Sequence, residues 1–190
     1  MKISVDKKIF EKFPTVSEYL VLARGVNVET SWSKHILEES KKNQAVLREE
    51  ISQKGLENLP KFQRWVDIYN QVLKESDANK KFRRSVLPTH VALAKRVAKG
   101  DDLPNINPLV NYYNSFSLKY HLPIGGEDLA HYYGDARLFF ATGDETYLET
   151  KGKSKVNVNK GEVVWCDGCS VCCRMWGWRQ CNRTRVTNST

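Results

Sequence analysis

The segment from Asn107 to Asp128 constrains the fold most strongly, because a periodic helix ends there in a glycine-containing turn. Its apolar residues recur at helical spacing, and one amide, Asn114, lies within that apolar face. A buried amide must be hydrogen-bonded, since it otherwise lowers stability. Pro123 ends the predicted helix, and residues 125–128 are expected to open a second helix whose first N–H groups are unpaired. Such a surface is suited to holding a carbonyl group or an anion.

The composition is that of a globular protein with room for one core. Of the 190 residues, 41% are hydrophobic and 27% are charged. We therefore expect a single domain over residues 1–190. No apolar run approaches the roughly 20 residues that cross a bilayer, and residues 1–13 contain no signal-peptide core. The sequence predicts a cytoplasmic protein with no membrane partner.

The period of the hydrophobic pattern changes several times along the chain. Helical spacing predicts helices at residues 32–51 (with Ser31 or Ser33 as N-cap), 60–73, 88–99 and from 107 onward. Apolar and β-branched runs predict strands at residues 2–5, 18–28, 137–142, 146–149, 156–158, 162–166, 169–176 and 185–187. Residues 75–87 are interpreted as a linker. The sequence thus predicts an α/β fold of the α+β type, with a mainly antiparallel sheet from the two chain ends and a central set of helices.

Asp167-Gly168 is expected to form the turn of a hairpin within that sheet. An Asp-Gly pair between two strands is typical of a two-residue type I′ turn. That turn would place Cys166 opposite Cys169 and Trp165 opposite Ser170.

Four of the five cysteines fall between residues 166 and 173, which suggests a zinc or iron–sulfur site. The adjacent residues Cys172 and Cys173 would point to opposite faces of a strand, however, and none of the four histidines lies in this segment. We expect no metal and no other cofactor, and we interpret the cysteines as small buried residues. A Cys166–Cys169 disulfide is geometrically conceivable, but a reducing compartment disfavours it.

The net charge of +8 favours polyanionic partners without identifying them. The excess is concentrated in residues 151–190, which carry eight basic and two acidic residues. A basic surface that only keeps the protein soluble is the alternative. The chain has no P-loop, no GxGxxG loop and no GxSxG elbow, which argues against nucleotide-binding and serine-hydrolase classes.

Several segments follow one another in an order typical of a known family. They are WVDIYNQVL (65–73), KKFRRSVLPTHVALAKRV (80–97), NPLVNYYNSFSLKYHLPIGGEDL (107–129), ARLFFATGDETY (136–147), KGEVVWCDG (160–168) and CCRMWGWRQCNRTRVTNST (172–190). Together they resemble the tRNA-editing domain of the phenylalanyl-tRNA synthetase β subunit, and more closely its free-standing relatives. The resemblance implies a mixed α/β domain. In the synthetase, this domain hydrolyses tyrosine wrongly attached to the phenylalanine tRNA.

The pattern of the family is changed at several pocket positions. Its pocket asparagine, in a VDxxN segment, falls on Asn114, whereas the acid of that segment is replaced by Asn111. The histidine that holds the misattached tyrosine falls on Gly125. The glutamate that reads the tyrosine hydroxyl would lie beyond Thr190, and the sequence is expected to be truncated before a final strand and helix. The resemblance therefore implies a different side-chain specificity.

The resemblance also implies roles for individual residues. Asn114 would orient the ester carbonyl, Gly125 and Gly126 would allow close backbone approach, and Glu127 would bind the substrate amine or a water. For Glu127 and Asp128 the alternative is a first-turn carboxylate favoured by the helix dipole.

Two further sets of residues are candidates for binding. The substrate-binding candidates are Trp176, Arg174, Arg179 and Thr184. The tRNA-binding candidates are Lys151, Lys153, Lys155, Arg183 and Arg185. For Arg174 and Arg179 the alternatives are phosphate binding and stacking on Trp176 and Trp178. Two functions remain open: a deacylase that hydrolyses a mischarged aminoacyl-tRNA in trans, and a non-catalytic amino-acid or tRNA-binding module. The expected partner is aminoacylated tRNA.

Overall fold

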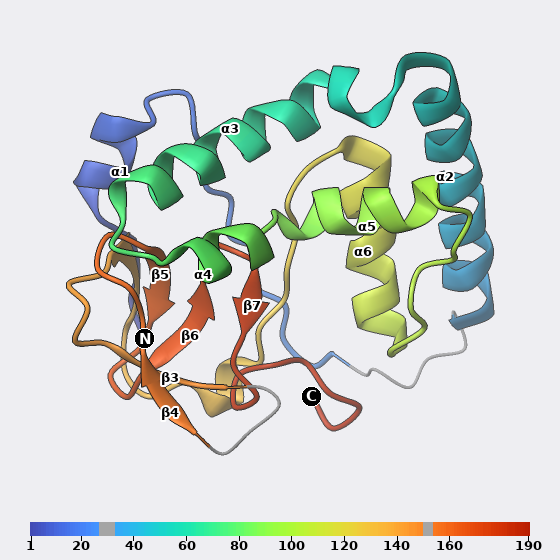
Figure 1. Ribbon diagram of the computed structural model, residues 1–190. Coiled ribbons are helices and arrows are strands. Elements are labelled where there is room, and N and C mark those ends of the chain that lie inside the picture. Colours follow the sequence, from blue (N-terminus) through green and yellow to red (C-terminus); the bar gives the residue numbers. More distant parts are fainter. Residues whose placement is uncertain (27–32, 150–153) are drawn as a thin grey trace. The chain divides into compact units, whose positions relative to one another are not determined.

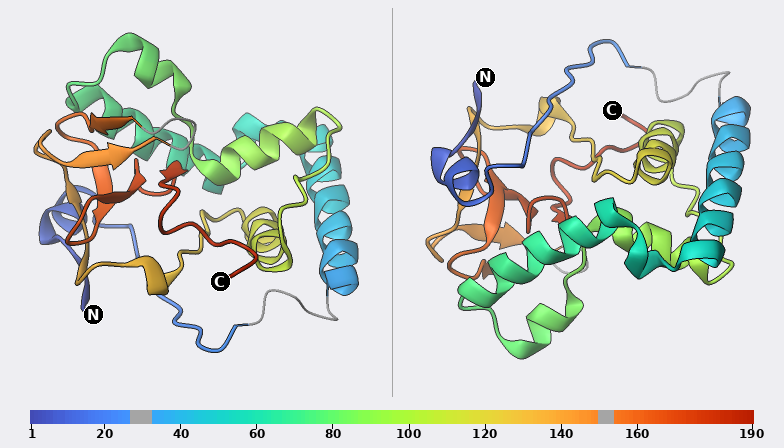
Figure 2. Two further views of the ribbon diagram at one scale, coloured as in Figure 1. Left: turned by 90° about the horizontal axis from the view of Figure 1, so that it is seen from below. Right: turned by 90° about the horizontal axis from the view of Figure 1, so that it is seen from above.

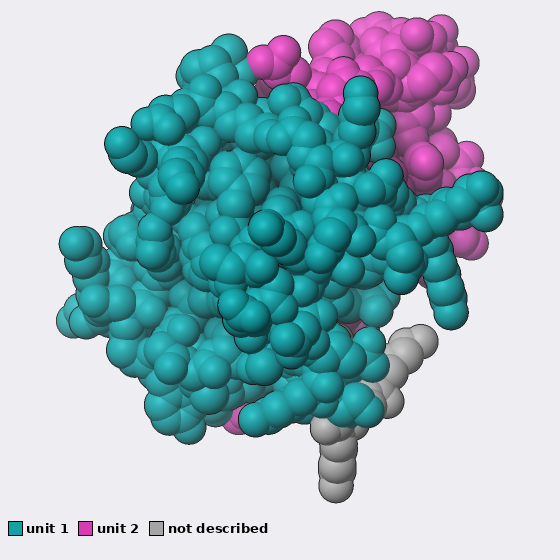
Figure 3. All heavy atoms as spheres, turned by 60° about the vertical axis from the view of Figure 1, so that its left-hand side comes forward, with its two compact units in different colours: residues 1–25, 68–86, 128–185 teal, residues 26–67, 87–127, 186–190 magenta. Residues whose placement is uncertain are grey.

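The computed structural model describes residues 1–26, 33–149 and 154–190 (Figure 1). The chain forms two compact units, which Figure 3 shows in different colours. Unit 1 comprises residues 1–25, 68–86 and 128–185, and unit 2 comprises residues 26–67, 87–127 and 186–190. Each unit is assembled from three segments that are separated in the sequence, and the division falls within one helix, α3 (Pro60–Glu75).

The described part of unit 1 is built on a five-stranded sheet with the order β1-β2-β5-β6-β7. The strands are β1 (Ile3–Val5), β2 (Ala136–Phe140), β5 (Val163–Cys166), β6 (Val171–Arg174) and β7 (Arg179–Gln180). β1 pairs with β2 in parallel, and the other neighbours are antiparallel. β3 (Thr146–Leu148) and β4 (Lys155–Asn157) form a separate antiparallel pair. A mixed α/β fold of the α+β type, with a mainly antiparallel sheet from the two chain ends, is thereby confirmed.

Short helices complete unit 1. They are α1 (Lys7–Lys12), α4 (Lys80–Ser85) and the 3₁₀ helix η2 (Leu129–His131). Asp6 caps α1 by accepting a hydrogen bond from Lys8 N, and Asn79 caps α4 by accepting one from Phe82 N. The prediction of a linker at residues 75–87 is wrong, since α4 lies within it. Two helical turns are too short to show an apolar period, so the pattern did not reveal this helix.

Unit 2 is helical in the residues that are described. It contains α2 (Ser33–Lys54), the 3₁₀ helix η1 (Leu56–Asn58), the first part of α3, α5 (Thr89–Ala98) and α6 (Pro108–Tyr120). α2, α5 and α6 pack against one another, and the two views of Figure 2 show α6 beside α2. The apolar faces that predicted these helices meet in one core of Leu47, Leu59, Phe62, Val91, Ala94, Val97 and Leu118. The four helix predictions are confirmed, although the proposed cap Ser31 lies outside the described residues. No helix in the described ranges is long and apolar enough to span a bilayer.

The prediction of a buried strand at residues 18–28 is wrong. Residues 18–26 form no strand, and residues 27 and 28 lie outside the described chain. The side chains from Tyr19 to Leu22 are exposed, with Tyr19 at 87% and Val21 at 94%. An apolar, β-branched composition favours a strand only where a neighbouring strand pairs with it, and no strand of the described sheets pairs with residues 18–26. The predicted strand at 185–187 is also absent.

The hairpin between β5 and β6 has a different register from the predicted one. Trp165 pairs with Cys173 and Cys166 pairs with Val171, with an irregularity between Trp165 and Cys166. The connecting turn is longer because the Asp167 carboxylate accepts hydrogen bonds from the backbone N–H groups of Cys169 (2.9 Å) and Ser170 (3.0 Å). A side chain that satisfies these donors competes with the tight type I′ turn.

Candidate functional site

Asn114 is positioned by α6, whose first turn is fixed by its cap. Asn107 accepts a hydrogen bond from Val110 N (2.9 Å), and Pro108 occupies the first helical position. Asn114 follows almost two turns later and is 7% exposed. Its neighbour Ser115 accepts a hydrogen bond from Asn43 Nδ2 (2.8 Å), whereas the Asn114 amide makes none with the residues that the structure describes. The Asn114 amide is therefore available to water or to a ligand.

Asn111 has a defined structural role at the start of the same helix. Its Oδ1 accepts a hydrogen bond from Ile106 N (2.9 Å), and its Nδ2 donates to Asn105 Oδ1 (2.6 Å). A carboxylate at this position would accept the first hydrogen bond and could not donate the second. The asparagine thus ties residues 105–107 to α6.

The chain after α6 does not form the second helix that the sequence analysis expected. His121 adopts a left-handed conformation (φ 56°) and ends α6, and Leu122 N donates to Ser117 O (3.1 Å). The next helical residues are those of η2, a single 3₁₀ turn. Asp128 is its N-cap, since its Oδ1 accepts a hydrogen bond from Ala130 N (3.0 Å). The expectation of several outward-facing N–H groups at residues 125–128 is therefore wrong: one turn offers few such donors, and Asp128 accepts one of them.

The two glycines of this turn differ in the space around them. A Cβ atom at Gly126 would lie 3.0 Å from Tyr113 Cε1 and 3.5 Å from Val186 Cγ2, so packing requires glycine there. A Cβ atom at Gly125 would have no atom within 4 Å. The backbone at Gly125 is accordingly open to approach, and a side chain at this position would be accommodated. Gly125, Gly126, Glu127 and Asn114 all belong to unit 2.

Arg174, a predicted substrate-binding residue, is paired inside unit 1. Its Nε lies 3.0 Å from Glu162 Oε2, and its Nη2 also pairs with the same carboxylate. The Arg174 side chain is 9% exposed and that of Glu162 is 0% exposed. The guanidinium also lies over the rings of Phe82 (4.5 Å to the centroid) and Tyr147 (5.5 Å). This arrangement neutralises and encloses the cation, so removal of either partner would leave the other charge buried and uncompensated.

The other predicted substrate-binding residues divide into buried and exposed groups. Trp176 is buried, and its Nε1 donates to Glu18. Thr184 is also buried, with its Oγ1 3.4 Å from Cys181 Sγ. Arg179 is exposed and lies over the ring of Trp178, 4.7 Å from the centroid. Aromatic stacking, one of the two alternatives for this arginine, is thus observed for Arg179 on Trp178.

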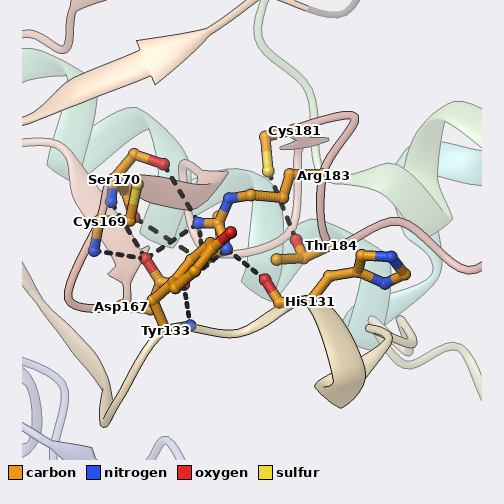
Figure 4. Close-up of polar contacts among 9 residues, drawn as sticks. His131, Tyr133, Asp167, Cys169, Ser170, Cys181, Arg183 and Thr184 are labelled. Atoms are coloured by element: carbon orange, nitrogen blue, oxygen red, sulfur yellow. Dashed lines mark hydrogen bonds and ion pairs between the residues drawn. The ribbon is translucent and has the colours of Figure 1, made fainter.

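Arg183, a predicted tRNA-binding residue, is the centre of a polar cluster in unit 1 (Figure 4). Its Nη1 and Nη2 lie 2.7 and 2.9 Å from the two carboxylate oxygens of Asp167. It also donates to Ser170 Oγ (3.2 Å) and to the carbonyl oxygen of His131, and it lies over the Tyr133 ring. A phosphate at Arg183 would have to compete with a bidentate carboxylate. Among the other tRNA candidates, Lys155 and Arg185 are exposed, and Lys151 and Lys153 lie outside the described residues.

The Asp167–Arg183 pair predicts a loss of stability in acid. Burial raises the pKa of Asp167, but hydrogen bonds from Arg183 and from backbone N–H groups outweigh it and lower the pKa to about 2. Because the pKa of the folded state is below the unfolded value of 3.8, the carboxylate stabilises the fold above pH 4. We expect about 2 kcal/mol to be lost between pH 4 and pH 2. Urea unfolding should show this loss in the wild type and in the exposed control Asp101→Asn, and a shallower dependence in Asp167→Asn.

The cysteines at positions 166, 169, 172 and 173, and Cys181, are free thiols. Burial, with the nearby carboxylates of Glu145 and Asp167, raises the pKa of Cys166 to about 12, so this thiol stays protonated at neutral pH. Within residues 1–26, 33–149 and 154–190, no three His, Cys, Asp or Glu side chains are grouped so as to hold a metal ion.

Two features of unit 1 were not identified as functional candidates from the sequence. The role of Asp167 in binding Arg183 was missed because Asp-Gly was interpreted as turn chemistry alone. The basic run at residues 80–84 was missed because it was assigned to a linker. Both could have been found from the sequence. A carboxylate and a cluster of four basic residues are each charged, so each must either pair with an opposite charge or remain in solvent.

Comparison with known protein families assigns the chain. The family model of the B3/4 domain matches residues 80–190, which is more than half of the chain. The match includes Asn114, the turn at residues 125–127, and the segment from Arg174 to Arg185. A search of the curated proteins finds no match to this chain. The chain therefore belongs to the B3/4 domain family and is related to the phenylalanyl-tRNA synthetase β subunit.

Proposed function

We propose that the protein binds aminoacylated tRNA and hydrolyses the ester bond of a mischarged aminoacyl-tRNA in trans. The proposal depends on one observation above all: within the region that matches the family, α6 carries a largely buried amide, Asn114, that pairs with no described group. An unpaired amide in such a position costs stability unless water or a ligand satisfies it. A carbonyl or water bound there would be held in a fixed orientation.

In the proposed reaction, the residues of unit 2 act on a substrate that is already activated. The Asn114 amide orients the ester carbonyl and the attacking water, and the open backbone at Gly125 approaches the developing oxyanion. Water adds to the carbonyl carbon and gives up a proton, the ester C–O bond breaks, and the expelled ribose oxygen takes up a proton that is relayed from the attacking water through the neighbouring ribose hydroxyl or a second water. Little help from a general base is needed, because the aminoacyl ester hydrolyses readily. Glu127 would bind the substrate amine.

The open space at Gly125 bears on which amino acid is removed. Because residue 125 is a glycine, no imidazole is present there to hold a tyrosine. The space that its side chain would occupy is open, with no atom within 4 Å of a Cβ built at this position. A pocket that lacks such hydrogen-bonding groups discriminates weakly against substrates lacking a hydroxyl. We therefore expect the preferred substrate to differ from tyrosyl-tRNA.

The proposal is tested by deacylation of a panel of mischarged tRNAs with the wild type and with Asn114→Ala. We expect at least one rapidly hydrolysed aminoacyl-tRNA and a loss of kcat on the order of 100-fold in the variant, since it removes one transition-state hydrogen bond. Asn70→Ala, at an exposed position of α3, is the matched control and should retain full activity. Hydrolysis by Asn114→Ala at the wild-type rate would refute the role of this residue.

A non-catalytic binding module is the second candidate. It is favoured by the burial of Arg174, Trp176 and Thr184, which leaves only one of the four predicted substrate-binding residues, Arg179, exposed. This candidate predicts no turnover on any aminoacyl-tRNA of the panel, together with binding of uncharged tRNA. In either case binding should weaken steeply with salt if phosphate contacts dominate.

A further inference from the structure

We propose that α4 and the turn between β6 and β7 form the surface on which the tRNA backbone docks. This α4 surface consists of Lys80, Lys81, Arg83, Arg84, Trp178 and Arg179, all in unit 1. The proposal rests on the proposed function in one respect only, namely that tRNA is the partner.

The two parts of the α4 surface are held together by aromatic contacts. Phe82, the inward residue of α4, meets the Trp178 ring edge-on, with 5.3 Å between the centroids. Arg174 lies over Phe82 on the sheet side, 4.5 Å from its centroid. The Asn79 cap and a hydrogen bond from Arg83 Nη2 to Ser76 O (3.0 Å) tie the helix to the segment that precedes it. A helix this short is marginal alone, so these contacts give the surface a defined shape.

The cations of α4 are exposed and have no carboxylate partner in the described residues. Lys80, Lys81, Arg83 and Arg84 are all exposed, and none forms an ion pair with any described carboxylate. The nearest acid on α3, Glu75, is already paired with Lys12. Other cations among the described residues are paired with carboxylates, including Arg174 and Arg183. An unpaired basic cluster of this kind attracts an external polyanion.

Trp178 favours RNA over other polyanions. Its side chain is partly exposed, and Arg179 lies 4.7 Å from its ring centroid. An accessible indole beside several cations allows a base to stack while the phosphates on either side are neutralised. A phospholipid headgroup would use the charges and has no flat ring to stack on the indole. The geometry therefore points to a nucleic-acid strand that contributes both phosphates and bases.

The test compares the affinity for uncharged tRNA of three forms of the full chain at several salt concentrations. The first variant is Lys80→Gln/Lys81→Gln/Arg84→Gln. The matched control, Lys34→Gln/Lys41→Gln/Lys42→Gln, removes the same charge from exposed positions of α2. We expect the α4 variant to bind on the order of tenfold more weakly and to lower the slope of log K against log salt by about 2 to 3. The control should change neither quantity as much.

Trp178→Ala separates stacking from charge. It should weaken tRNA binding by about tenfold and leave the salt slope unchanged, because no phosphate contact is lost. Thermal melting of every variant confirms folding. Equal weakening in the α4 variant and in the α2 control would overturn the proposal, as would tighter α4-dependent binding to anionic phospholipid vesicles than to tRNA.

An ester substrate without a tRNA body distinguishes this proposal from the proposed function. With an aminoacyl-adenosine, the α4 variant should hydrolyse at the wild-type rate and Asn114→Ala should be impaired. If the α4 variant bound tRNA with wild-type affinity and still hydrolysed the ester, the α4 surface would be refuted and the proposed function would stand. Binding that depends on α4 without hydrolysis of any ester would refute the enzyme and support the surface.

Discussion

Arg174→Met is expected to lower the free energy of unfolding by about 3–5 kcal/mol, the usual cost of leaving one partner of a buried ion pair uncompensated. The substitution keeps most of the side-chain volume but leaves the Glu162 carboxylate, which is 0% exposed, without its cation. Glu162 would retain its hydrogen bond from Asn159 N (2.7 Å), which only partly offsets the loss. Chemical denaturation at pH 7 measures the effect.

A double variant separates the ion pair from the packing around it. Arg174→Met/Glu162→Gln removes both charges, and we expect it to recover a large part of the stability that Arg174→Met loses. Arg179→Met is the control, since Arg179 is an exposed arginine of the neighbouring strand that stacks on Trp178 without a carboxylate. If Arg174→Met were no less stable than Arg179→Met, the pair would not stabilise the fold.

His90 is expected to make unit 2 unstable in acid. It is 0% exposed, and neither ring nitrogen has a partner among the described residues. Its ring stacks on Phe62 (5.3 Å between centroids), and the ring of His121 stacks on Phe62 as well (4.6 Å). Three charged groups act on His121: Glu50, Lys61 and Lys54. Burial, assisted by the positive charge of His121, lowers the pKa of His90 to about 3.

The direction of the effect follows from that pKa. Because the folded pKa lies below the unfolded value of 6.5, the unfolded state binds a proton first as the pH falls. Between pH 6.5 and pH 3, each pH unit should remove about 1.4 kcal/mol from the free energy of unfolding. Circular-dichroism melts at pH 7.5, 5.5 and 4.5 should show the loss in the wild type.

His90→Leu provides the test of that assignment. The variant has no titrating group at this position, so its acid slope should be shallower, and it no longer buries two unpaired nitrogens. The control His35→Leu replaces an exposed histidine of α2 and should keep the wild-type slope. An unchanged slope in His90→Leu would mean that other groups cause the acid sensitivity.

The sequence predicted the long helices because their stabilising pattern is local. Asn107 and Pro108 mark the start of α6, and the apolar face of α3 repeats over 16 residues. α1 and α4 have six residues each and depend on one capping side chain and on contacts with distant residues. Residues 18–26 show the opposite error, since their apolar composition is typical of a strand although no partner strand pairs with them.

For the candidate site too, the features set by local sequence were predictable and those set by distant contacts were not. The position of Asn114 on the apolar face of α6 follows from helical spacing alone, and its burial agrees with that spacing. The pairing of Arg174 with Glu162 was not predictable, because it depends on how β5 and β6 align across an irregular hairpin. The Asp167 carboxylate accepts the backbone hydrogen bonds of Cys169 and Ser170 in the longer turn beside that irregularity. The composition of the hairpin was informative, whereas its register required the three-dimensional structure.

Unit 1 is built from three segments that are far apart in the sequence, so it cannot fold completely until the last segment has been synthesised. β1 is synthesised before the other strands of the sheet, and its partner β2 begins 133 residues later, where Ala136 pairs with Ile3. Most contacts of α2, α5 and α6 join residues made earlier, so the helical segments can associate while the sheet still lacks its central strands. Residues 1–5 must therefore remain unpaired through most of synthesis. The sheet of unit 1 closes only when residues 163–180 have emerged.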